Sequence, residues 1–175
     1  MLVITGVALF FVYRPTVSAS WSDLIDDRYT GEVQLAHLVR VLHRLASQLA
    51  VWTAIVTGIV VAVRTAGPRR WAAPAVGAGL AVTTVAASFT GYLLPWDQLA
   101  LWAVTVGSTL GGYRPLFGSH VRFVLIDGAE VGRSTTVRWL AVHALVLGPL
   151  LVGLVALAWR RHENAGSTDD PLPGS

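Results

Sequence analysis

The chain is 175 residues long and strongly apolar, with 54% hydrophobic and only 13% charged residues. Because a soluble domain of this length needs more charged surface, the composition predicts a membrane protein. The net charge of +3 is small and no basic stripe lies outside the segment ends, which argues against nucleic acid as a partner. The absence of cysteine excludes disulfides, thiolate-bound clusters and any cofactor attached through cysteine.

The opening segment, Met1 to Tyr13, is apolar but short. Thirteen residues rise only about 20 Å as a helix, less than the roughly 30 Å of a hydrocarbon core. Either this segment belongs to a longer helix or its neighbours hold it short. A cleavable signal peptide is disfavoured, because no basic region precedes the apolar run and no small-residue cleavage site follows it.

Three longer apolar segments each satisfy the length of about 20 residues that a membrane-spanning helix needs. They are Leu35 to Val63, Trp71 to Leu94 and Val137 to Trp159. Between the last two lies the apolar stretch Leu99 to Leu110, which is too short to span and is predicted to lie as a helix along the outer surface.

The predicted fold is therefore an all-α transmembrane four-helix bundle. Residues 1–163 form one membrane domain, and residues 164–175 form a polar tail with two prolines that is predicted to be disordered.

Arginine placement predicts the orientation, since cytoplasmic helix ends are enriched in basic residues. The clustered arginines are Arg64, Arg69, Arg70, Arg160 and Arg161. The connections 14–34 and 95–136 are therefore expected outside, with the amino terminus cytoplasmic. We expect an integral protein of a bacterial plasma membrane, in contact with lipid.

Two histidines, His43 and His143, lie inside the second and fourth apolar segments, which run in the same direction. Counted from Arg64 and Arg160, their depths differ by about 6 Å, which helix tilt can absorb. Ionisable groups inside a membrane are functional by default. Two neutral imidazoles on facing helices can ligate one haem iron, whereas the simpler alternative is a hydrogen bond from each to a neighbouring helix.

Four neighbouring residues fit such a haem site. Arg40 and Arg138 precede the histidines by three and five residues, where a guanidinium can pair with a haem propionate or simply extend to the membrane surface. Gly6 and Gly91 offer places where a flat macrocycle can approach the backbone, although small residues also serve helix packing.

These residues occur in segments that resemble cytochrome b, the haem subunit of quinol:cytochrome c oxidoreductases and their photosynthetic counterparts. The resemblance covers nearly the whole chain as the amino-terminal four-helix domain. It implies that His43 and His143 are the axial ligands of the haem nearest the outer face, with Arg40, Arg138, Gly6 and Gly91 beside it. The matching segments are Ile4-Thr5-Gly6, Arg40 to Arg44, Gly91 to Ala103 and Arg138 to His143.

The chain departs from the family pattern at the inner haem. The family places a second histidine fourteen residues after each ligand, and here those positions are Thr57 and Leu157. Neither side chain can ligate iron, so we expect one non-covalent haem b instead of two. His162 coincides with a family position at the inner quinone site, but a basic, solvated helix end is the better interpretation.

The Pro-Glu-Trp-Tyr motif of the family's outer quinol site does not occur in this sequence. We therefore expect a single-haem b-type cytochrome that transfers electrons near the outer face of a quinol-linked respiratory chain. It would act as a subunit of an oxidoreductase complex and not catalyse alone, with quinol or quinone and other redox subunits as partners. The alternatives are a membrane anchor with a vestigial haem site and a quinone-binding module without haem.

Overall fold

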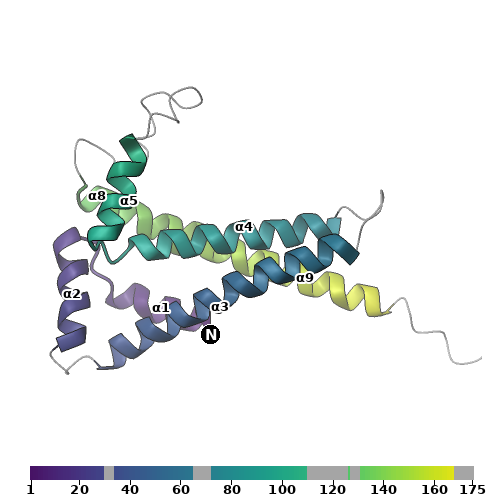
Figure 1. Ribbon diagram of the computed structural model, residues 1–175. Coiled ribbons are helices and arrows are strands. Elements are labelled where there is room, and N and C mark those ends of the chain that lie inside the picture. The colour runs from purple at the N-terminus through teal and green to yellow at the C-terminus, as the bar shows by residue number, and fades with distance from the viewer. Residues whose placement is uncertain (30–33, 65–71, 110–125, 127–130, 168–175) are drawn as a thin grey trace, which may run out of the picture.

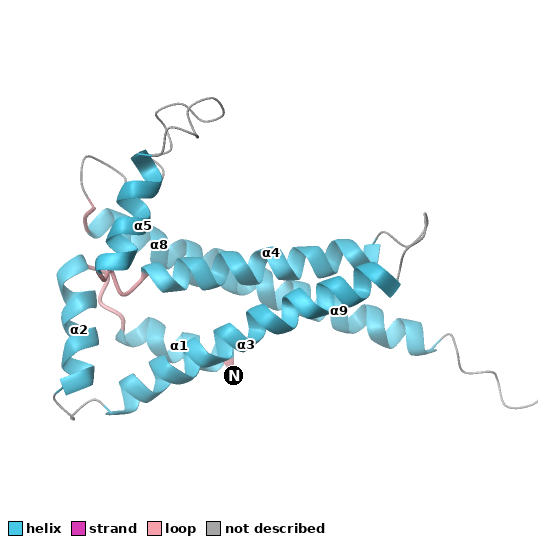
Figure 2. Cartoon of the chain, viewed as in Figure 1, coloured by secondary structure: helices cyan, strands magenta, loops and turns pink. Residues whose placement is uncertain are grey.

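The computed structural model describes residues 1–29, 34–64, 72–109, 126 and 131–167. Within these ranges the chain is helical, and Figure 2 shows helices joined by short loops. The helices are α1 (Leu2–Val12), α2 (Val17–Tyr29), α3 (Gln34–Arg64), α4 (Ala72–Leu93), α5 (Gln98–Thr109), α8 (Arg133–Ala141), the π-helical turn η2 (Val142–Leu147) and α9 (Gly148–Ser167).

The three predicted spans are confirmed. Helices long and apolar enough to cross a membrane cover Leu35–Val61, Ala73–Leu93 and Arg133–Arg161, the last formed by α8, η2 and α9 together. The protein is thus an integral membrane protein with an all-α transmembrane fold. Helix α9 continues to Ser167, past Asn164 where the sequence predicts the polar tail to begin, and residues 168–175 lie outside the described part.

Figure 1 shows α1, α3, α4 and α9 running alongside one another, while α2 and α5 lie across one end of the bundle, called here the α2–α5 end. Helix α3 packs against α1 and α4, and α4 packs in turn against η2 and α9. The helix predicted over Leu99 to Leu110 is confirmed as α5. Asp97 caps it, because its Oδ1 accepts a hydrogen bond from the Ala100 N–H at 2.8 Å.

Helix α1 extends only part of the way along α3 (Figure 1). The chain turns by 118° between α1 and α2, and two hydrogen bonds hold this turn. The Tyr13 hydroxyl donates to the Leu94 carbonyl at 2.8 Å, and the fully buried Thr136 donates to the Pro15 carbonyl at 2.7 Å. The carboxyl end of α1 is therefore bonded to both α8 and the end of α4.

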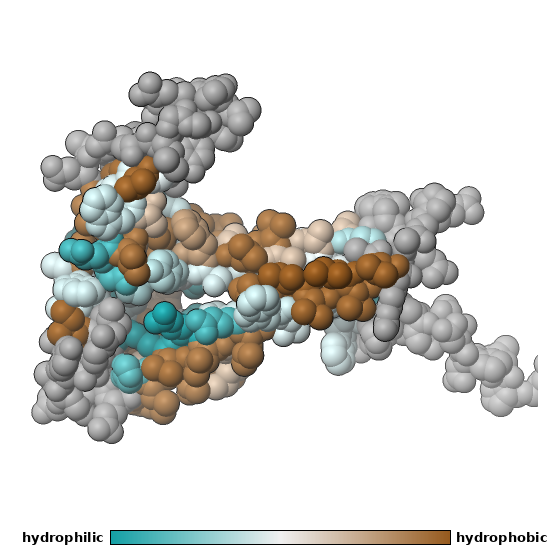
Figure 3. Space-filling view, in the orientation of Figure 1, coloured by the Kyte–Doolittle hydropathy of each residue, from teal (hydrophilic) through white to brown (hydrophobic). Residues whose placement is uncertain are grey.

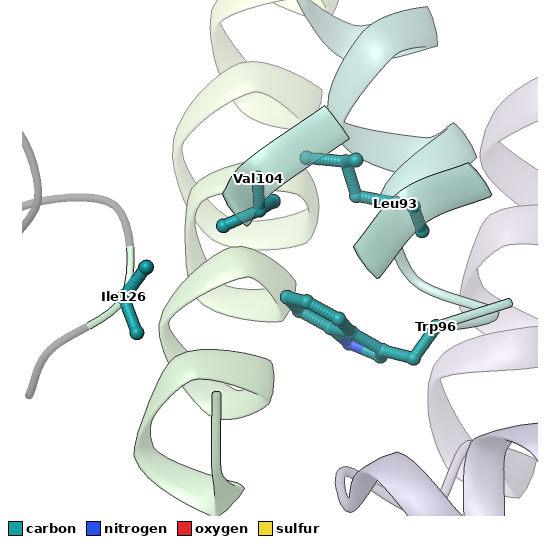
Figure 4. Close-up of a cluster of buried hydrophobic side chains, with 5 residues drawn as sticks. Leu93, Trp96, Val104 and Ile126 are labelled. Atoms are coloured by element: carbon teal, nitrogen blue, oxygen red, sulfur yellow. The ribbon is translucent and has the colours of Figure 1, made fainter. Parts of the chain in front are cut away.

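A hydrophobic cluster fills the α2–α5 end. Trp96 is 3% exposed and adopts a positive φ of 49°, which is unusual for a bulky side chain. Figure 4 shows its indole close to Leu93 and Val104. The full cluster is Leu93, Trp96, Ala100, Val104 and Ile126. Burial of the indole thus stabilises the strained turn that joins α4 to α5.

The helices meet differently toward the opposite end, where α3 and α4 approach through glycines. A Cβ on Gly58 would lie 3.6 Å from the Gly77 carbonyl oxygen, and a Cβ on Gly77 would lie 3.5 Å from the Gly58 Cα. The two helices thus pack closely here, so that a Cβ on either glycine would already be in van der Waals contact with the other helix, as small residues allow between membrane helices. Figure 3 shows hydrophobic side chains along the visible flank here, with hydrophilic ones nearer the α2–α5 end.

The π-helical turn η2 has a local cause. The Gly148 N–H donates to the His143 carbonyl, five residues earlier instead of four. Pro149, the next residue, has no N–H and its ring would collide with the carbonyl four residues before it in a regular helix. Widening the preceding turn avoids that collision.

Candidate metal centre

His43 of α3 and His143 of η2 lie close together within the bundle. Their ring centroids are 6.3 Å apart and the ring planes are inclined at 74°. Both residues are half-buried. The two helices that carry them are separated in sequence by α4 and α5, so only the folded bundle brings the rings together.

The separation suits a metal ion shared by both rings. Metal–imidazole bonds are about 2.0 Å and a ring centre lies about 1 Å beyond its nitrogen, which gives roughly 6 Å between centroids. The observed 6.3 Å agrees with this value. Two neutral imidazoles are also a common axial donor set for haem iron, so the residues present fit that group.

The two predicted glycines lie against these rings. A Cβ on Gly91 would come within 2.8 Å of the His143 Cε1, closer than real Cβ contacts allow. A Cβ on Gly6 would lie 3.3 Å from the His43 Cε1, which is tight but less severe. Glycine is therefore needed at position 91 for the His143 ring to occupy its place, and is favoured at position 6 for His43.

Two threonines that the sequence analysis did not single out contact the histidines. Oγ1 of Thr5 lies 2.8 Å from the His43 Nδ1, and Oγ1 of Thr90 lies 3.0 Å from the His143 Nδ1. Each threonine directly precedes one of the glycines, so a Thr-Gly dipeptide occurs on both α1 and α4. That dipeptide, which occurs a third time as Thr57-Gly58 on α3, is the sequence signal that could have drawn attention to them.

The two predicted arginines lie on the same helices as the histidines. Arg40 is one turn from His43 on α3, and Arg138 is in the last turn of α8, just before η2. Both side chains are half-buried. They are therefore displaced from the imidazoles toward the α2–α5 end. Among the other histidines, His37 lies on α3, His162 lies in the last turns of α9, and His120 falls outside the described residues.

The structure corrects one register argument from the sequence. A π-helical turn holds about one residue more than an α-helical turn, so about fifteen residues, not fourteen, return the helix from His143 to the same face. The position that shares this face is therefore Ala158 and not Leu157, whose side chain is 41% exposed. Neither residue offers a metal-ligating nitrogen.

Comparison with known proteins agrees with this geometry. The family model described as Cytochrome b/b6/petB matches residues 1–160. The chain is 36% identical over 158 residues to cytochrome b6 of Acaryochloris marina (strain MBIC 11017), covering 87% of this chain and 70% of that protein. It is 35% identical over 163 residues to cytochrome b6 of Mesostigma viride, covering 90% and 73%. The corresponding protein of Gracilaria tenuistipitata var. liui is 35% identical over 160 residues, covering 89% and 71%.

Proposed function

The chain belongs to the cytochrome b/b6 family of haem-binding, electron-transferring membrane proteins, and from this premise we propose that it is a single-haem subunit acting near the outer membrane face. In this proposal His43 and His143 are the axial ligands of one non-covalent haem b. The observation that carries it is the 6.3 Å separation of the two rings, which come from different helices of the bundle.

Four further residues complete the proposed site. Arg40 and Arg138 lie on the side of the histidines toward the α2–α5 end, where their guanidinium groups would pair with the propionates. Gly6 and Gly91 hold the rings against the helix backbones and leave room for the edge of the macrocycle. Bound there, the haem would supply one-electron transfer, while the protein sets its ligation, dielectric and access.

One observation supports one haem instead of two. The sequence contains no histidine between His43 and His120, and none between His143 and His162, so no second ligand pair exists at the deeper level whichever register is used.

The arginine distribution supports the orientation. Arg64 ends α3, and Arg160 and Arg161 lie in α9, all at the end of the bundle opposite α2 and α5. Under the positive-inside rule this end is cytoplasmic, as expected for a bacterial plasma membrane protein whose first segment starts from that side. The paired histidines then lie in the outer half, so electrons would pass between a quinol or an outer redox protein and a partner subunit on the same side.

Haem stoichiometry tests the proposal. The full chain purified in detergent should carry one haem with a low-spin bis-imidazole spectrum, and His43→Ala or His143→Ala should each abolish that spectrum. His37→Ala, on the same helix as His43, is the matched control and should retain the haem. Two haems per chain, or an unchanged spectrum in either ligand variant, would contradict it.

The two alternative functions give different results in the same experiment. A membrane anchor with a vestigial site would show no low-spin haem in the wild-type chain. A quinone-binding module would instead show altered quinone reduction in the His43→Ala and His143→Ala variants, with haem content unchanged. Either result would overturn the single-haem proposal.

A further inference from the structure

The contacts between threonines and histidines place a hydroxyl at the same atom of both rings. Thr5 of α1 and Thr90 of α4 each lie at hydrogen-bond distance from an Nδ1, at 2.8 Å and 3.0 Å. Both threonines are buried, at 6% and 5% exposure, so water does not compete for the bond. Each imidazole is thus bonded at Nδ1 by a helix other than its own.

The number of protons on each group limits which atom can donate in these bonds. A threonine hydroxyl carries one proton and two acceptor lone pairs. The Thr5 hydroxyl donates to carbonyls of its own helix, at 3.1 Å from the Met1 oxygen and 3.2 Å from the Leu2 oxygen. The Thr90 hydroxyl does the same, at 3.0 Å from the Ala86 oxygen and 3.1 Å from the Ala87 oxygen.

A threonine within a helix usually donates to a carbonyl of its own backbone, and with each hydroxyl proton directed there the Oγ1 atom accepts from the histidine. In that arrangement the Nδ1 atom carries the proton. A neutral imidazole has one N–H, so Nε2 is left with a free lone pair. This is the nitrogen that a metal ion can use.

We propose that Thr5 and Thr90 are positioning residues that select the Nδ1–H tautomer of His43 and His143 and thereby present both Nε2 atoms to one metal. The inference rests on the proposed function for the metal, but the tautomer itself is a property of the chain alone. The hydrogen bond also restricts rotation of each ring, so each ring plane is set by the helix that carries its threonine.

This arrangement explains why a glycine follows the threonine at both positions. For a ring nitrogen to approach Oγ1 of a threonine on a neighbouring helix, the ring must lie almost against that helix. The glycine that follows provides the space, since a Cβ on Gly91 would lie 2.8 Å from the His143 ring and one on Gly6 would lie 3.3 Å from the His43 ring. Threonine and glycine therefore act together, one bonding the imidazole and the other accommodating it.

The first test measures the tautomer without haem. Nitrogen NMR of the full chain in detergent, labelled with ¹⁵N-histidine, should show His43 and His143 protonated at Nδ1, whereas free histidine favours Nε2–H. Thr5→Val should shift His43 toward Nε2–H or a mixture, and Thr90→Val should do the same for His143. Thr5→Ser and Thr90→Ser retain a hydroxyl and should restore the Nδ1–H form.

The second test measures haem binding. Loss of such an orienting hydrogen bond typically weakens metal binding by about 10- to 100-fold, so each valine variant should lower haem affinity by that factor. The EPR g values of the ferric haem, which depend on the angle between the ring planes, should also shift. In the valine variants the reduction potential of the haem should rise. The Nδ1–H hydrogen bond that these variants lose makes imidazole a stronger donor to ferric iron.

Thr84→Val is the matched control, since Thr84 is buried on the same helix as Thr90 and donates to its own Leu80 carbonyl. It should change neither tautomer nor affinity. If His43→Ala and His143→Ala lose haem but the valine variants keep wild-type tautomers, affinity and g values, the inference is wrong while the proposed function stands. If the wild-type chain binds no haem, the proposed function fails and the NMR result alone decides the inference.

Discussion

Gly58 of α3 and Gly77 of α4 face each other so closely that a Cβ on Gly77 would lie 3.5 Å from the Gly58 Cα, at a level of the bundle about 21 Å from the paired histidines. The same four-helix arrangement thus has two different halves. In one half two imidazole side chains lie between α3 and η2, and in the other α3 and α4 pack closely through glycines. This difference makes the half that lacks histidines a helix-packing region.

Gly58→Leu should destabilise the bundle. A Cβ there already reaches van der Waals contact with the Gly77 carbonyl oxygen, so the rest of a leucine side chain would press against α4, and overpacking of this kind costs about 1–3 kcal/mol. Gly153→Leu is the control, because a Cβ at Gly153 meets nothing within 4 Å. The free energy of unfolding in mixed detergent should fall for the first variant relative to the second. Equal stabilities would show that α3 and α4 do not pack through these glycines.

Gly91→Ala should perturb the histidine site more than Gly6→Ala. The added methyl group would lie 2.8 Å from the His143 ring in the first case and 3.3 Å from the His43 ring in the second. We expect haem affinity to fall on the order of tenfold for Gly91→Ala and less for Gly6→Ala. Gly107→Ala, on α5 with open space around it, should be neutral. The reverse order of the two effects would contradict the observed ring positions.

Thr136→Val should loosen the turn between α1 and α2. The fully buried Thr136 hydroxyl donates to the Pro15 carbonyl at 2.7 Å, and its loss leaves that carbonyl without this donor. The expected destabilisation is about 1–3 kcal/mol, measured as the free energy of unfolding. Thr53→Val provides the comparison, since this exposed threonine bonds the Leu49 carbonyl of its own helix. A similar small change in both variants would argue against an anchoring role for Thr136.

Asp97→Ala should destabilise the first turn of α5. Its carboxylate accepts the Ala100 N–H at 2.8 Å, and loss of an N-cap costs about 0.5–2 kcal/mol. Hydrogen exchange at the amides of the first turn of α5 should become faster, by the factor that this loss of free energy implies. Asp97→Asn keeps an acceptor oxygen and should exchange nearly as slowly as the wild type. Fast exchange in the asparagine variant would mean that charge, and not the cap bond, stabilises the turn.

Several features could be predicted from sequence because they depend on neighbouring residues along the chain. Hydropathy predicted the three spans and helix α5 within a few residues, since each requires only a run of apolar side chains of sufficient length. The histidine pair followed from counting residues to the arginines at the helix ends. This estimate needed only the rise per residue of an α-helix.

Other features depended on distances between helices, which no local pattern contains. Sequence reasoning found Gly6 and Gly91 but overlooked Thr5 and Thr90, because a threonine in a helix ordinarily bonds its own backbone and reveals no partner. It also used a regular helix after His143, whereas Pro149 widens that turn and moves the matching position from Leu157 to Ala158.

The amino-acid sequence alone therefore determined which segments cross the membrane and which histidines lie at a common depth, because both are set by residue type and position along one helix. Only the tertiary structure decided that the two rings lie 6.3 Å apart, that Thr5 and Thr90 bond them, and that Gly58 and Gly77 close the other half. The reason is physical: contacts between helices arise from the packing of whole surfaces, and atomic separations follow only once every helix has its place.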